Sequence, residues 1–254
     1  MSVAKDLEII ESPPEDVIFP PGDLYSDEPP LESDLHLWQI FLLLQCLEWH
    51  WRDRNDFYAA GNLTIYYSHR RRKSEDFRGP DFFAVLGTER KHRKSWVVWQ
   101  EDGKYPNIII ELLSDSTAKV DRGLKKQIYQ DTFRTPDYFW FHPETLEFAG
   151  FCLISGSYQP IEPNDRGWLW SQQLELYLGI CDRKLRYFTA EGILVPTPQE
   201  FAQAQIQLAQ EQTQLAQEQT QLAQAQTQLA EAQTQRAEAL AAKLRELGVD
   251  PENL

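Results

Sequence analysis

The sequence has only three cysteines in 254 residues, Cys46, Cys152 and Cys181, and they lie far apart in the chain. Such spacing excludes a disulfide framework or a thiolate zinc site and is typical of buried thiols in a reducing compartment. The N-terminus is acidic and lacks the apolar segment of a signal peptide. We therefore expect a cytoplasmic protein.

Long hydrophobic runs are also missing. The longest lies around Ile40 to Leu44, whereas a helix that crosses a bilayer needs about 20 apolar residues. We therefore expect no membrane partner.

Basic residues are scarce at both ends of the chain. Residues 1–34 hold ten acids and one base, and residues 200–254 hold eight acids and three bases. The net charge of −14 therefore resides in the ends, and the centre is neutral. An acidic total normally disfavours nucleic acid, but residues 68–94 carry nine bases against four acids. This basic segment either contacts phosphates or is a solvated loop or edge.

Composition divides the chain into three parts. Residues 1–30 combine acids with paired prolines and are expected to be extended or disordered. Residues 31–197 have the strand and helix patterns of one globular domain. Residues 198–254 form a tail in which the unit Q-T-Q-L-A-Q-E repeats every seven residues, and its composition predicts a long helix.

The leucine spacing of the tail resembles the d column of a coiled coil. These leucines are Leu208, Leu215, Leu222 and Leu229. The matching a positions hold glutamines, which weaken such a seam: Gln212, Gln219, Gln226 and Gln233. A homo-oligomer formed through this helix and a solvated single helix are both open.

A first helix is predicted from about Ser33 to Asp53, with Ser33 or Asp34 as its N-cap. Its expected apolar face is formed by Leu35, Trp38, Leu42, Cys46 and Trp49. Because the helix is apolar nearly all round, we expect it to lie between the sheet and another element. His36 and Glu48 on this helix either line a site or have partnered structural roles.

Alternation and β-propensity predict several strands, and one strand carries a glutamate out of place. The strands are expected at residues 62–67, 82–86, 96–99, 108–113, 138–141, 146–153, 168–177 and 184–188. This order predicts an α/β fold with a central sheet. Glu111 lies inside the apolar strand 108–113, where an isolated carboxylate costs several kcal/mol unless it is paired, protonated or bound to metal.

The helix after this strand has N-cap candidates at residues 114–117. Asp121, Lys125 and Tyr129 recur every four residues and should share one face. Val120, Leu124 and Ile128 are expected to form the stripe that packs on the sheet. Lys125 on the flank of this stripe should approach Glu111, whereas Lys126 should be solvated.

Two carboxylates on adjacent strands can hold a divalent cation. Asp81 follows Pro80 at the mouth of one strand, and Glu111 lies near the end of another. Mg²⁺ typically uses one or two carboxylates together with a substrate phosphate. Lys125 could then orient a water molecule or stabilise a developing anion. The alternative is an ordinary Pro80-Asp81 turn and a structural Glu111–Lys125 ion pair.

Four ordered segments carry a family resemblance: G-P-D-F-F at residues 79–83, I-I-I-E-L-L-S-D-S-T at 108–117, D-R-G-L-K-K-Q-I-Y at 121–129 and T-P-D-Y-F-W-F-H-P at 135–143. Together they resemble the Uma-two family of the restriction-endonuclease-like PD-(D/E)xK superfamily over roughly residues 30–190. The resemblance implies a mixed central sheet flanked by helices and a metal-dependent phosphodiesterase site.

The resemblance implies site roles for individual residues. Asp81 and Glu111 match the two acidic metal ligands, and the backbone carbonyl of Leu112 matches a third. The usual lysine position, two residues after the acid, holds Leu113. The lysine that matches the family lies instead on the following helix, as Lys125. Further candidates for support of the site are Glu32, His36, Glu48, Ser114, Asp121 and Tyr129.

The resulting hypothesis is a Mg²⁺- or Mn²⁺-dependent endonuclease that hydrolyses phosphodiester bonds of nucleic acid. DNA is the expected substrate, and RNA or branched nucleic acid is an open alternative. The alternative is a non-catalytic binding or regulatory module that self-associates or recruits a partner through its C-terminal coiled coil.

Overall fold

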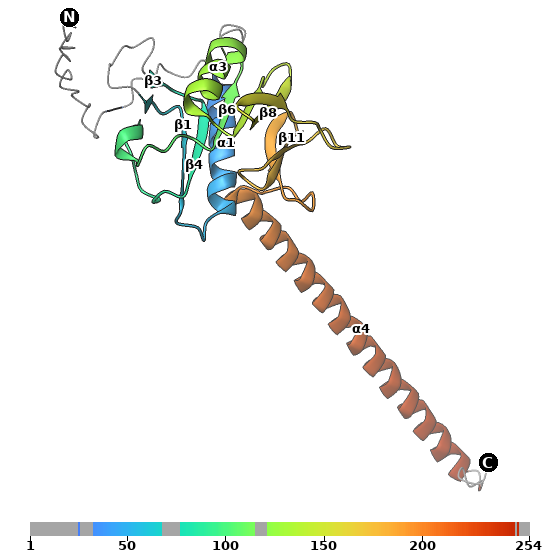
Figure 1. The fold of residues 1–254 in the computed structure, drawn as a ribbon. Coiled ribbons are helices and arrows are strands. Elements are labelled where there is room, and N and C mark those ends of the chain that lie inside the picture. The colour runs from blue at the N-terminus through green and yellow to red at the C-terminus, as the bar shows by residue number, and fades with distance from the viewer. Residues whose placement is uncertain (1–24, 26–32, 68–76, 115–120, 247, 249–254) are drawn as a thin grey trace, which may run out of the picture. The chain divides into compact units, whose positions relative to one another are not determined.

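The computed structural model describes residues 25, 33–67, 77–114, 121–246 and 248. Its central element is a six-stranded sheet (Figure 1). In spatial order the strands are β1 (Phe57–Gly61), β4 (Phe82–Leu86), β6 (Ile108–Leu112), β7 (Asp137–Phe141), β8 (Phe148–Ile154) and β9 (Ser157–Pro160). Strands β6 and β7 are parallel, and the other neighbours are antiparallel. The predicted fold class, a mixed central sheet flanked by helices, is confirmed.

Two smaller sheets accompany the central one. One is antiparallel and consists of β10 (Leu169–Ser171), β11 (Leu176–Cys181) and β12 (Lys184–Phe188). The other pairs β2 (Ile65–Tyr66) with β3 (Phe77–Arg78) and β5 (Trp96–Val97).

Several strand predictions need correction. Strand β1 was not predicted, because its Ala-Ala-Gly end lacks strong β-formers. The strand expected at 96–99 stops at Val97 and continues as a 3-10 turn, η1 (Val98–Gln100). The stretch 168–177 is two strands, because residues 172–175 turn the chain and Glu175 adopts a positive φ of 55°.

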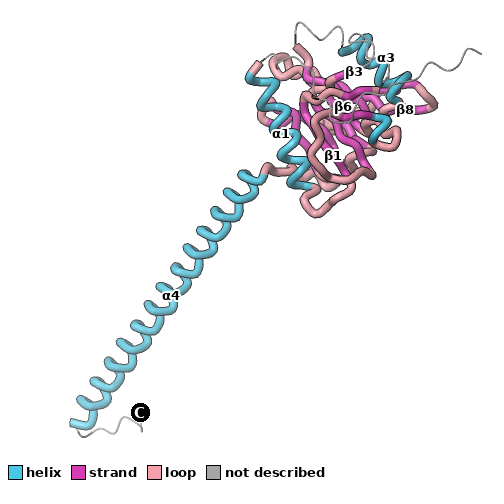
Figure 2. Tube along the Cα trace, turned by 90° about the vertical axis from the view of Figure 1, so that its left-hand side faces the viewer, coloured by secondary structure: helices cyan, strands magenta, loops and turns pink. Residues whose placement is uncertain are grey.

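The central sheet separates two cores, because side chains of β6 alternate between its faces. Ile108, Ile110 and Leu112 face the core beneath helix α1 (Asp34–His50) and the β10–β12 sheet. Ile109 and Leu113 face the core beneath the helical segment that follows β6. Figure 2 shows α1 and this segment on opposite sides of the strands.

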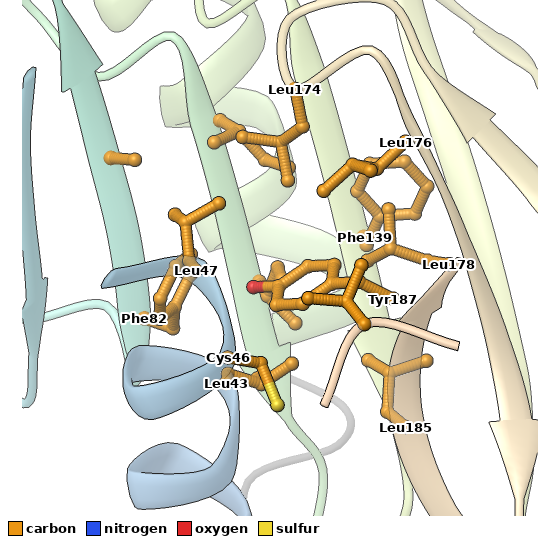
Figure 3. Packing of buried hydrophobic residues seen from close by; sticks show 14 of the residues in the cluster. Leu43, Cys46, Leu47, Phe82, Phe139, Leu174, Leu176, Leu178, Leu185 and Tyr187 are labelled. Atoms are coloured by element: carbon orange, nitrogen blue, oxygen red, sulfur yellow. The ribbon is translucent and has the colours of Figure 1, made fainter. Parts of the chain in front are cut away.

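Helix α1 begins at the predicted cap, where the Ser33 hydroxyl accepts a hydrogen bond from the His36 N–H. Its predicted buried face is wrong for Leu35 and Trp38, which are 51% and 61% exposed, and right for Cys46, which is buried. The helix instead turns a neighbouring face inward, and Figure 3 shows Leu43, Cys46 and Leu47 packed toward the sheet. Because the helix is apolar nearly all round, its sequence alone does not determine which face is buried.

Two polar side chains contribute to this choice of face, because both find backbone partners inside. The Gln39 amide donates to the Leu185 carbonyl over 2.9 Å and accepts from the Leu185 N–H over 3.1 Å. His36 is equally buried and contacts β6, as described below. Polar groups with partners can therefore occupy positions that a hydrophobic pattern assigns to solvent.

The helical segment after β6 is π-helical at both ends, in η2 (Asp121–Lys125) and η3 (Tyr129–Phe133), with α3 (Lys126–Ile128) between them. Its predicted apolar stripe is right for Ile128, which packs against the core on this face, and wrong for Leu124. Leu124 is 56% exposed, and Tyr129 and Phe133 are the buried residues. A π-turn contains more residues than an α-turn, so a stripe drawn at α-helical spacing drifts off the buried face. Val120 lies outside the described residues.

The chain forms two compact units, residues 1–197 and 198–254. The second contains helix α4 (Pro198–Glu246), a single helix of 49 residues. Within the described ranges, no helix combines the length and hydropathy that crossing a bilayer requires.

Candidate active site

Sheet register brings Asp81 and Glu111 together. Strands β4 and β6 pair Phe82 with Ile110, so the next position outward sets Asp81 opposite Glu111. The Asp81 N–H lies 3.5 Å from Glu111 Oε2. Alternation along both strands turns the two carboxylates to the face covered by the helical segment after β6.

Glu111 is fully buried and is held by two donors from that helical segment. The Lys125 ammonium donates to Glu111 Oε2 over 3.1 Å. The Tyr129 hydroxyl donates to Glu111 Oε1 over 2.6 Å. Lys125 keeps 22% of its side chain exposed, whereas Tyr129 is buried. The carboxylate thus lies between a cation near the surface and a phenol in the core.

The protonation of Glu111 reflects this burial. Desolvation raises its pKa from the ordinary 4.5 to about 7, and the Lys125 charge opposes the rise. The Asp81 carboxylate contributes to this rise, by repulsion and by a side-chain hydrogen bond. The Tyr129 hydroxyl lowers it. Burial and a carboxylate this close therefore favour a proton on Glu111 near neutral pH.

Asp81 is also linked to the backbone that follows Glu111. Its Oδ2 accepts a hydrogen bond from the Leu112 N–H over 2.7 Å. The carbonyl of Leu112 lies 2.7 Å from His36 Nε2 on helix α1. A carbonyl oxygen can only accept, so Nε2 carries the proton in this contact. Nδ1 of the same ring lies 3.2 Å from the Ser33 hydroxyl.

The donor set fits a divalent cation that prefers oxygen. Asp81 and Glu111 supply carboxylates, and the Leu112 carbonyl retains a second lone pair beside its bond to His36. Burial, with a smaller contribution from the Asp81 charge, raises the pKa of Glu111, and a bound cation would stabilise the ionised carboxylate. No group of three His, Cys, Asp or Glu side chains gathers among the residues described. Two carboxylates match Mg²⁺, which keeps water or substrate ligands.

The remaining predicted site residues fall into three groups. Glu48 lies away from this cluster and forms an ion pair with Arg90. Ser114 lies two residues after the end of β6 and is half-buried. Glu32 and the side chain of Asp121 lie outside the described part of the chain.

The basic segment is largely neutralised where the structure describes it. Arg90 pairs with Glu48, Lys91 with Glu89 over 3.1 Å, and Arg93 with Glu101 over 2.7 Å. Arg93 also stacks over the rings of Tyr58 and Trp96. These contacts favour the structural interpretation for residues 90–93. Residues 70–73 lie outside the described ranges.

Lys126 is not the solvated residue that helical spacing predicts. Its Nζ lies 3.3 Å from the centre of the Phe151 ring and 5.4 Å from that of Trp140. Burial lowers the pKa of this lysine. The two adjacent lysines therefore have different partners, a carboxylate for Lys125 and aromatic rings for Lys126.

Comparison with known proteins gives a family. Among solved structures, the chain is similar to one from Anabaena variabilis ATCC 29413 titled a "putative nuclease belonging to DUF820", with a TM-score of 0.46 and 12% identity over 61% of this chain and 83% of that chain. The search of curated proteins found no match. Residues 4–185 match the family Uma2, which is described as "Putative restriction endonuclease". Since this match spans well over half of the sequence, the chain belongs to the Uma2 family.

Proposed function

We propose that this protein is a metal-dependent endonuclease that hydrolyses phosphodiester bonds of DNA. The observation that carries the proposal is the contact of Asp81 and Lys125 with the buried carboxylate of Glu111. Family membership supports it, because Uma2 is described by a nuclease activity. A buried ion pair alone would be a weak indication, but a second carboxylate beside it points to charge that must be balanced by a cation.

Asp81, Glu111 and the Leu112 carbonyl would hold Mg²⁺ or Mn²⁺. The metal, when bound, neutralises charge on a scissile phosphate and lowers the pKa of a water molecule. Both carboxylates are fixed in advance by donors on other elements. Such preorganisation avoids the cost of ordering ligands at the moment of reaction.

Lys125 is the residue proposed to meet substrate. Its ammonium lies on Glu111 and remains 22% exposed, so it can also reach an anion that approaches from solvent. A fixed cation at this position would orient a phosphate oxygen or the attacking water. Tyr129 is buried and cannot meet substrate in the same way. Its hydroxyl positions Glu111 and stabilises the ionised carboxylate.

The test is cleavage of supercoiled plasmid DNA and of RNA with Mg²⁺, with Mn²⁺ and with chelator. Wild type is expected to cleave DNA only with metal, and Asp81→Asn and Glu111→Gln should each abolish cleavage. Glu48→Gln is the matched control, because it also removes one acidic charge but changes the Arg90 pair. Cleavage by Asp81→Asn at the wild-type rate would exclude this site. Cleavage of RNA alone would reassign the substrate.

A second candidate function is a binding module that works through helix α4. The described residues of this helix include no buried one, and its leucines are exposed at intervals of seven. Truncation after Pro198 separates the two candidates. Unchanged cleavage with a smaller oligomeric mass favours the nuclease, whereas no metal-dependent cleavage by either form favours the binding module.

A further inference from the structure

Helix α4 presents a column of apolar side chains to solvent. Leu208, Leu215, Leu222 and Leu229 are between 48% and 62% exposed. Helices in proteins derive most of their stability from packing an apolar face. A strictly sevenfold column over several turns is the pattern of a helix face that packs against another helix in a coiled coil.

The exact period of seven indicates how this partner is wound. Leucines every seven residues on a straight α-helix drift about 20° per repeat around the axis. A left-handed supercoil removes this drift and keeps the column on one line. The 49 residues of α4 would span about 74 Å at 1.5 Å per residue. That length covers about half of a typical supercoil pitch.

The layers of the seam identify the partner. With the leucines at d, the a positions hold Gln205, Gln212, Gln219, Gln226 and Gln233. In a parallel pair in register, a packs against a and d against d, so leucine meets leucine and glutamine can hydrogen-bond to glutamine. In an antiparallel pair, a packs against d, and every layer sets an amide against a leucine. An amide buried without a partner is costly.

The flanking charges agree with the parallel arrangement. The acids beside the seam are Glu211 and Glu218, at g positions, and each would face an alanine of the other chain, Ala216 or Ala223. No acid opposes an acid in this register. Each glutamate also accepts a hydrogen bond from its own helix, from Gln207 over 3.2 Å and from Gln214 over 3.3 Å. These bonds hold the acids along the helix flank.

We propose that α4 pairs with α4 of a second copy of this chain as a parallel, in-register, two-stranded coiled coil. This inference names the partner of the binding function considered above and is independent of the nuclease site. The five glutamine layers make the seam weaker than one with aliphatic a residues. The pairing is therefore expected to be concentration-dependent.

Cysteine cross-linking of the full-length chain tests the orientation. Leu215→Cys is expected to form a disulfide-linked dimer on mild oxidation, because identical d residues adjoin only in a parallel pair in register. Thr213→Cys is the matched control: Thr213 lies at an outward b position and should not cross-link. Oxidised wild type gives the background from its own three cysteines. A Leu208→Cys chain that cross-links to a Gln226→Cys chain, with no Leu215→Cys dimer, would overturn the parallel arrangement, because a d residue adjoins an a residue only in an antiparallel pair.

A second variant tests the seam without cysteine. Gln219→Ile places an aliphatic residue at a, so it should raise both the dimer fraction in sedimentation and the thermal midpoint of the helical signal. In a solvated single helix the same change should give no rise, because isoleucine is a poorer helix former than glutamine. Thr220→Ile, one residue away at a b position, is the control and should leave the mass unchanged. A monomeric or trimeric mass for both wild type and Gln219→Ile would overturn the proposal.

Discussion

The hydroxyl of Tyr129 donates to Glu111 Oε1 over 2.6 Å, from a helix turn after the lysine that occupies Oε2. One helical segment thus supplies both donors to one buried carboxylate. The phenol is neutral and buried, whereas the ammonium is charged and partly exposed. The two contacts should therefore be separable by mutation.

Tyr129→Phe should keep the fold and weaken metal binding. The ring stays in the core, but Glu111 loses a hydrogen bond that lowers its pKa, so its ionised form becomes less available. We expect a stability loss of roughly 1–2 kcal/mol and weaker Mn²⁺ binding by titration calorimetry. Tyr158→Phe is the control, because it removes a comparable buried hydrogen bond, to the Thr135 carbonyl over 3.0 Å. It should lower stability without changing the affinity for Mn²⁺.

Without metal, the protein should lose stability as the pH rises toward 7. The pKa of Glu111 is about 7 in the folded protein, above its ordinary value of 4.5. The folded state therefore binds the proton more tightly than the unfolded chain. This contribution is complete below about pH 4.5 and lost as the pH rises through 7, a decrease of roughly 3 kcal/mol.

Denaturant unfolding in chelator between pH 5 and 8 measures this decrease. Glu111→Gln should flatten the profile; Asp137, whose pKa burial also raises, is unchanged in this variant. The Mn²⁺ affinity of wild type should rise over the same interval, because the cation displaces the proton. A Glu111→Gln profile as steep as that of wild type would contradict the assignment.

The strands of the central sheet were largely predictable from sequence. A strand buried on both faces appears as an apolar run, and turn-forming residues mark its ends. In the central sheet, β4 has the predicted ends, and β6 and β7 differ from prediction by one residue; β12 of the smaller antiparallel sheet also has the predicted ends. The contact of Lys125 with Glu111 also follows from spacing, since both lysine and strand are local to one crossover. Short sequence separation fixes such contacts.

Features set by distant contacts were not predictable. The buried face of α1 depends on Leu112 and Leu185, which accept or donate to His36 and Gln39 across more than 70 residues. The position of Lys126 depends likewise on Phe151, which lies on β8. The hydrophobic pattern of a helix does not indicate either kind of partner. A lysine that contacts an aromatic ring and a buried amide with a backbone partner produce no periodic pattern in the sequence.

Lys125→Met and Lys126→Met should differ sharply although the residues are adjacent. Lys125→Met leaves Glu111 without its charged partner, which should raise the pKa of Glu111 and reduce DNA cleavage by at least about 100-fold. Lys126→Met keeps an apolar chain on the Phe151 ring and should leave cleavage within about twofold of wild type. Initial rates of plasmid nicking with saturating Mg²⁺ distinguish them. Equal losses in both variants would indicate a general electrostatic effect instead of a specific contact.

His36→Leu tests whether the carbonyl of Leu112 must be held in place. The substitution removes the 2.7 Å contact of Nε2 with that carbonyl, so the oxygen is no longer oriented from α1. Groups that orient metal ligands typically change metal affinity 10–100-fold. We expect weaker Mn²⁺ binding of that order by calorimetry, with the metal concentration for half-maximal cleavage raised in proportion and the rate at saturating metal reduced less.

Gln39→Leu provides the control for this variant, because Gln39 lies one helical turn away and also binds backbone, that of Leu185 on β12. Both substitutions should lower the free energy of unfolding, since each leaves backbone groups in the core without their hydrogen-bond partner. Only His36→Leu should shift the metal dependence of cleavage. If the two variants shift it equally, α1 acts through general stability, and the Leu112 carbonyl is then no part of the site.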